Sequence, residues 1–97
     1  MALEGLHESR ESLTPETLEL RRGIASLIEE LEAVAYYQQR VDAAGDPELK
    51  AILAHNRDEE KEHAAMLIEW LRRKDARFAE EIQNYINTTA PIVELEG

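Results

Sequence analysis

The sequence contains no cysteine, which excludes a disulfide framework, a thiolate metal site and a cysteine nucleophile. Only three histidines are present, so any metal site must depend mainly on carboxylates. The four glycines and three prolines leave no room for a glycine-rich phosphate loop. These shortages exclude most enzymes that act on nucleotides.

Positive charge is also scarce, because 11 lysines and arginines face 21 acidic residues and leave a net charge of −10. Nucleic acid is therefore not expected as a partner, since phosphate binding needs a basic surface. An anionic membrane surface is disfavoured for the same reason. No apolar run approaches the roughly 18–20 residues of a membrane span, and no signal segment opens the chain. We expect a single small domain that binds neither nucleic acid nor membrane.

The sequence does contain clear signals for where helices begin and end. Thr14-Pro15-Glu16 combines an N-cap, a proline at the first helical position and an acid on the positive helix end. The first long helix is predicted to end at Ala44, with a left-handed cap at Gly45. Asp46-Pro47-Glu48 repeats the start signal, and the second long helix is predicted to end near Lys74.

The helix signals predict an all-α fold with three parts. Residues 1–13 form a flexible segment, residues 14–87 a helical half-bundle domain with a short third helix capped by Asp75, and residues 88–97 a tail. Two long helices joined by so short a turn must run antiparallel. A lone hairpin cannot cover both of its apolar stripes. Two chains are therefore expected to pair into a four-helix bundle.

Both long helices carry a seam with the alternating four- and three-residue spacing of a heptad repeat. In the first helix the seam consists of Leu20, Ile24, Leu27, Leu31, Val34, Gln38 and Val41. In the second helix it consists of Leu49, Leu53, Asn56, Glu60, His63, Leu67 and Trp70. Three consecutive positions of the second seam are polar. A carboxylate and an imidazole that face a bundle core are destabilising unless they are paired or bind a metal.

Glu60-x-x-His63 places a carboxylate and an imidazole on adjacent turns, where both can reach one metal ion. At 100° per residue, Glu30 lies about 60° from the centre of the first seam and therefore flanks the core. One chain thus holds half of a carboxylate-bridged two-metal site, and a two-fold dimer would supply four carboxylates and two imidazoles. Such oxygen and nitrogen donors suit iron or manganese.

Three neighbours of Glu30 divide between the two sides of the first helix. Tyr37 lies only about 20° further round than Glu30 and shares its side. Glu29 and Glu32 lie about 200° and 140° from the seam centre and point outward, where they could concentrate cations.

Two less specific interpretations remain open on the residues alone. The chain could be a non-catalytic acidic assembly module in which Glu60 and His63 set the helix register. It could also be a bundle that binds metal without turnover.

The chain resembles the encapsulated ferritins of the ferritin-like superfamily. The matching stretches are residues 28–42 (IEELEAVAYYQQRVD), 54–64 (AHNRDEEKEHA) and 69–73 (EWLRR), and the likeness extends over roughly residues 13–94. The resemblance implies a dimer that oxidises Fe(II) to Fe(III) with two irons at the dimer interface. It also implies assembly into a ring, commonly a decamer, that is cargo of an encapsulin shell in the prokaryotic cytoplasm.

The resemblance further implies roles for individual residues. Glu30, Glu60 and His63 would ligate iron, and the Tyr37 hydroxyl would lie close by. Glu29 and Glu32 would form an outer acidic site through which metal enters and where Ca²⁺ can bind. Two features depart from the family pattern: Tyr36 stands where relatives have Trp, and no apolar, Arg-containing shell-targeting tail precedes Gly97.

Overall fold

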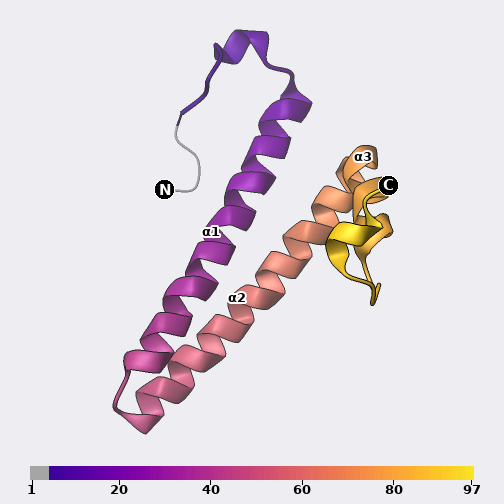
Figure 1. Cartoon of the computed structure of the whole chain (residues 1–97). Coiled ribbons are helices and arrows are strands. Elements are labelled where there is room, and N and C mark those ends of the chain that lie inside the picture. The colour runs from indigo at the N-terminus through magenta and orange to yellow at the C-terminus, as the bar shows by residue number, and fades with distance from the viewer. Residues whose placement is uncertain (1–4) are drawn as a thin grey trace.

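The structure, a computed structural model that describes residues 5–97, contains helices and no strands within that range (Figure 1). It confirms the predicted all-α class with two long antiparallel helices and a short third one. The elements, in chain order, are η1 (Arg10–Ser12), α1 (Pro15–Ala43), α2 (Pro47–Lys74), α3 (Ala76–Tyr85) and η2 (Ile92–Leu95). Residues 1–4 of the predicted flexible segment lie outside the described residues.

Each α-helix begins at the cap that the sequence predicts. The backbone N–H of Thr17 donates to Thr14 Oγ1 at 3.1 Å, and that of Leu49 donates to Asp46 Oδ2 at 2.8 Å. The Asp75 side chain accepts in the same way at the start of α3. Such a cap stabilises a helix by about 1 kcal/mol because it satisfies a backbone donor that has no partner in the first turn.

The predicted left-handed cap at Gly45 is wrong. The C-cap of α1 is Ala44 in extended conformation (φ −68°, ψ 131°), and Gly5 is the only glycine with positive φ within residues 5–97. The connection instead has extended backbone at Ala44 and at Asp46 (φ −79°, ψ 122°), and Asp46 directly precedes Pro47, which disfavours helical backbone at that residue. A left-handed residue occurs instead after α3, where Asn87 has φ 58°.

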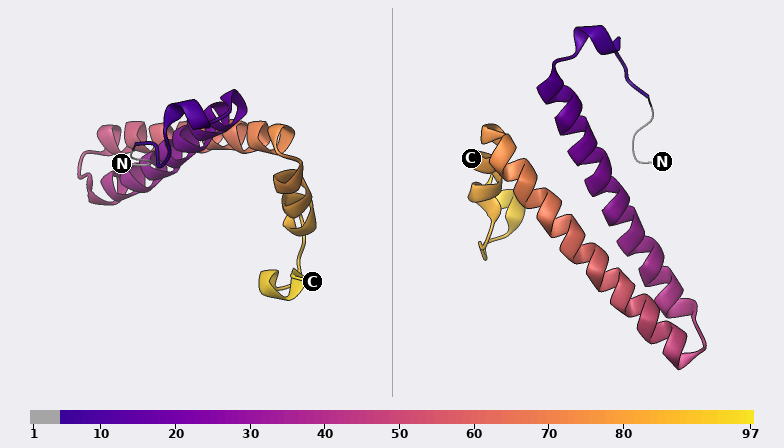
Figure 2. Two further views of the ribbon diagram at one scale, coloured as in Figure 1. Left: turned by 90° about the horizontal axis from the view of Figure 1, so that it is seen from above. Right: turned by 180° about the vertical axis from the view of Figure 1, so that it is seen from behind.

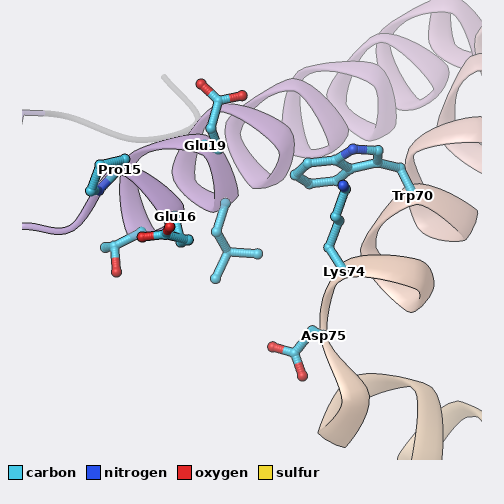
Figure 3. A pocket seen from close by; sticks show the side chains of 8 residues that line it. Pro15, Glu16, Glu19, Trp70, Lys74 and Asp75 are labelled. Atoms are coloured by element: carbon cyan, nitrogen blue, oxygen red, sulfur yellow. The ribbon is translucent and has the colours of Figure 1, made fainter.

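The two long helices lie side by side in one layer and diverge from the turn toward their far ends, which gives a V-shaped hairpin (Figures 1 and 2). Helix α3 leaves this layer at a steep angle. At the open end, a cleft of about 490 Å³ separates the start of α1 from the end of α2 (Figure 3). It is lined by residues that include Leu20, Trp70 and Lys74.

One chain buries very little apolar surface. Within residues 5–97 the buried hydrophobic side chains are Val41, Ala64 and Leu71. The seam residues Leu31 and Leu49 remain 51% and 48% exposed. The hairpin therefore leaves part of its apolar seam uncovered. Across residues 5–97 the helices lack an apolar stretch of the length that a bilayer crossing requires.

Candidate metal centre

The hairpin brings three of the predicted ligands together between its long helices. Glu30 comes from α1, and Glu60 and His63 come from adjacent turns of α2. One ligand atom from each side chain lies within 4.8 Å of the other two. His63 Nδ1 is 3.6 Å from Glu30 Oε2 and 3.4 Å from Glu60 Oε2. Two ligands of one metal ion lie up to about 4 Å apart, since each is about 2 Å from it, so both distances suit a shared ion.

The cluster faces partly inward and partly outward. The side chains of Glu30 and Glu60 are 26% and 23% exposed, whereas that of His63 is 46% exposed. The carboxylates therefore lie in the groove between the helices and the imidazole lies at its margin. A metal held here would be reachable from one side of the hairpin.

Glu30 Oε2 is a buried oxygen without a hydrogen-bond partner in the structure. A buried carboxylate oxygen in this situation is destabilising unless a cation or a proton reaches it. The second carboxylate, that of Glu60, adds like charge near the same imidazole nitrogen. The cluster is thus chemically incomplete alone, and a divalent cation with a preference for oxygen and nitrogen ligands fits it.

The remaining predicted site residues do not join this cluster. Tyr37 is half-buried on α1, and the Arg40 guanidinium lies 5.2 Å from the centre of its ring. Glu29 is exposed and Glu32 is half-buried, and neither belongs to the ligand group found within residues 5–97. Their predicted roles in metal uptake therefore stay predictions.

A polar contact between the helices was not anticipated from the sequence. Arg57 Nη1 of α2 donates to Gln38 Oε1 of α1 at 3.0 Å, and Gln38 Nε2 donates to Asp42 Oδ1 at 3.0 Å. The Arg57 side chain is only 19% exposed. Its hydrogen bond to Asp58 holds the pKa of that carboxyl below its usual value. The signal available in the sequence was the single polar residue of the first seam, Gln38.

A helical hairpin that presents a Glu-x-x-His motif to a glutamate on the facing helix has the architecture of half a ferritin-like carboxylate bundle. The sequence profile of the EncFtn-like family matches residues 5–89, and the chain belongs to this family. The resemblance to encapsulated ferritins is thereby confirmed.

Three relatives are similar along most of the chain. The encapsulated ferritin-like protein of Rhodospirillum rubrum is 61% identical over 94% of this chain, which spans 65% of that protein's length. A ferritin-like protein of Thermotoga maritima is 49% identical over 93% of this chain and 79% of its own. The encapsulin nanocompartment cargo protein EncC of Myxococcus xanthus is 44% identical over 66% of this chain and 52% of its own.

The fold is also that of a solved protein. The crystal structure of a Nitrosomonas europaea protein superposes with a TM-score of 0.87 at 58% identity and covers 92% of this chain and 98% of that one. The arrangement of the hairpin and its third helix is thus shared with an experimental structure.

Proposed function

We propose that two copies of this chain pair and oxidise Fe(II) to Fe(III) at a two-iron site shared across their interface. The observation that carries the proposal is the incomplete cluster of Glu30, Glu60 and His63, in which Glu30 Oε2 is buried without a partner. Membership of the EncFtn-like family supports iron as the metal. Iron is the substrate of this reaction.

The open seam of the hairpin supports the pairing. Leu31 lies next to Glu30 and is 51% exposed, and Leu49 is 48% exposed on α2. A two-fold partner that covers these side chains would bring its own cluster toward the exposed His63. The pair would supply four carboxylates and two imidazoles, which is the full ligand set of a two-iron bundle site.

The proposed reaction transfers one electron from each of two Fe(II) ions. With dioxygen as oxidant, two Fe(II), one O₂ and two protons give two Fe(III) and one hydrogen peroxide. With hydrogen peroxide as oxidant, two Fe(II), one H₂O₂ and two protons give two Fe(III) and two waters. The carboxylates of Glu30 and Glu60 offset the rising metal charge, and His63 Nδ1 donates its lone pair to iron. Tyr37 contributes a hydroxyl on the same side of α1.

The outer acids Glu29 and Glu32 guide cations toward the site in this proposal, and Ca²⁺ can occupy them. Glu29 is exposed, and the net charge of −10 raises the local cation concentration. Replacing both with Gln is expected to slow Fe(II) uptake at low ionic strength, while the number of irons bound at saturation stays unchanged. Stopped-flow measurements over a salt series check this. An uptake rate equal to that of the wild type at every salt concentration contradicts the uptake role.

The names of two relatives support enclosure of this chain in a protein shell. One relative is an encapsulated ferritin-like protein and another is an encapsulin cargo protein. We infer a ring of dimers, a decamer, enclosed in an encapsulin shell that stores the oxidised iron inside a prokaryotic nanocompartment.

The first experiment is native mass spectrometry of the purified chain before and after anaerobic addition of Fe(II). An even-numbered assembly with two irons per pair of chains supports the shared site. An assembly without bound iron refutes the iron site and favours the acidic assembly module.

The second experiment compares Glu60→Ala with Glu62→Ala. Loss of Glu60 removes one ligand from each half-site and is expected to abolish Fe(II) oxidation without loss of helicity. Glu62 is exposed on the same helix, so its replacement controls for lost negative charge. Oxidation is followed by ferric absorbance under air, and binding by mass spectrometry without oxygen. Unchanged oxidation in Glu60→Ala refutes the ligand assignment, whereas iron binding without oxidation in the wild type indicates a structural metal site.

A further inference from the structure

The indole of Trp70 on α2 lies directly against the backbone of α1 at Gly23. A Cβ atom at Gly23 would come within 2.9 Å of three ring carbons, whereas ordinary van der Waals contact begins at 3.4 Å. Only glycine therefore permits this approach. Glycine weakens a helix interior relative to alanine, so its presence inside α1 calls for such a packing reason.

This contact stands in a fixed register with the metal ligands. Gly23 precedes Glu30 by seven residues, and Trp70 follows His63 by seven residues. Because the helices are antiparallel, both pairs lie on the same stripe, two helical turns or about 10.5 Å apart. The hydrogen bond between Arg57 and Gln38 lies on the other side of the ligands, toward the turn.

On the far side of Trp70 the helices have already separated. The cleft of about 490 Å³ begins there, between Leu20 of α1 and Lys74 of α2. Figure 3 shows the indole reaching from α2 toward α1 at the edge of this cleft. The indole thus fills the space between the two helices at the point where the cleft begins.

We propose that the seating of Trp70 on Gly23 positions α2 against α1 so that Glu60 and His63 meet Glu30 at ligand distance. The inference rests on the proposed function, since it concerns the same three ligands. Gly23 and Trp70 are positioning residues here, because they act on the ligands through the spacing of the helices.

Gly23→Ala tests the contact, because its methyl group must displace the indole. In this variant kcat for Fe(II) oxidation is expected to fall about 10–100-fold with a smaller change in KM, because the ligands hold the reacting iron ions in the wrong positions. The Mössbauer spectrum of anaerobically bound Fe(II) should change as well, a readout that lost stability alone would leave untouched. Gly45→Ala is the matched control, since a Cβ there meets nothing within 4 Å.

Trp70 is the only tryptophan, so fluorescence and near-ultraviolet circular dichroism of the apoprotein report its displacement directly. Trp70→Leu removes the ring without crowding α1 and is also expected to lower kcat. When Gly23→Ala is added to Trp70→Leu, kcat should not fall further. The two single variants and the double variant together form a double-mutant cycle.

The positioning role is overturned if Gly23→Ala moves the indole but keeps the wild-type kcat and Mössbauer spectrum. It is also overturned if Gly23→Ala lowers kcat equally in the presence and in the absence of the Trp70 ring. If Gly23→Ala does not assemble, Trp70→Leu is the test, and a wild-type kcat in that variant overturns the role. A wild-type chain that binds no iron refutes the proposed function itself. An active wild type with unaffected variants refutes only the positioning role.

Discussion

Glu69 accepts hydrogen bonds from two arginines in the last two turns of α2. Arg72 Nε and Nη2 donate to its two oxygens, each at 2.7 Å, and Arg73 Nε donates at 2.7 Å. The hydrogen bonds from Arg72 and then Arg73 lower the pKa of Glu69 from 4.5 to about 2. The arginines also stand near the negative end of the helix, which favours cations.

This lowered pKa predicts a pH dependence with a definite sign. A carboxylate whose folded pKa lies below its unfolded value contributes stability that is complete above pH 4.5 and is lost as the pH falls through about 2. Glu69→Gln should therefore be less stable than the wild type above pH 4.5, and the difference should shrink toward zero near pH 2. Because the group is exposed, the whole effect is small.

Urea unfolding at a series of pH values and equal protein concentration measures this difference. Glu62→Gln is the control, because Glu62 forms no ion pair with any of residues 5–97. A difference between Glu69→Gln and the wild type that stays constant from pH 5 to pH 2 would contradict the assigned hydrogen bonds.

At the scale of the helices, local signals in the sequence were sufficient to predict where each α-helix begins. Thr14, Asp46 and Asp75 are each a short polar side chain before a helical run, and each caps a helix in the structure. The polar interruption of the second seam likewise predicted that Glu60 and His63 would face the core of the bundle, and the structure brings both to Glu30 of α1. These features follow from helical periodicity and short-range hydrogen bonding, which the sequence contains directly.

Other contacts between the two helices could not be predicted in this way. Gln38 is a lone polar residue in an apolar seam, and nothing local indicates that Arg57 will meet it. Gly23 is a lone glycine in a helix, and only the fold reveals that Trp70 occupies the space above it. Gly45 lies between Ala44 and Asp46, which both have extended backbone, and it does not adopt the left-handed conformation that glycine allows.

At the scale of the whole molecule, the chain is an open V with a radius of gyration of 17.2 Å and extents of 50 × 40 × 19 Å. A compact 97-residue domain would have a radius of gyration of about 13 Å. Only three hydrophobic side chains within residues 5–97 are buried, so the hydrophobic effect within one chain is small. The missing burial must come from contact with other chains if the protein is to be stable.

This shortage predicts that thermal stability depends on protein concentration. If folding is coupled to pairing, tenfold dilution destabilises the folded pair by about 1.4 kcal/mol through mass action. For a pair of this size each kcal/mol shifts Tm by about 2–4 °C, so each tenfold dilution should lower Tm by roughly 3–6 °C.

Circular dichroism melts at three concentrations, with sedimentation velocity at each, test this dependence in the metal-free chain. A Tm that stays constant while the chain sediments as a monomer would show that one hairpin is stable alone. Addition of Fe(II) without oxygen should raise Tm and weaken the concentration dependence, because iron bound by ligands from both chains links them. The same ion that completes the cluster of Glu30, Glu60 and His63 would then also stabilise the pair, so substrate loading and assembly would reinforce each other.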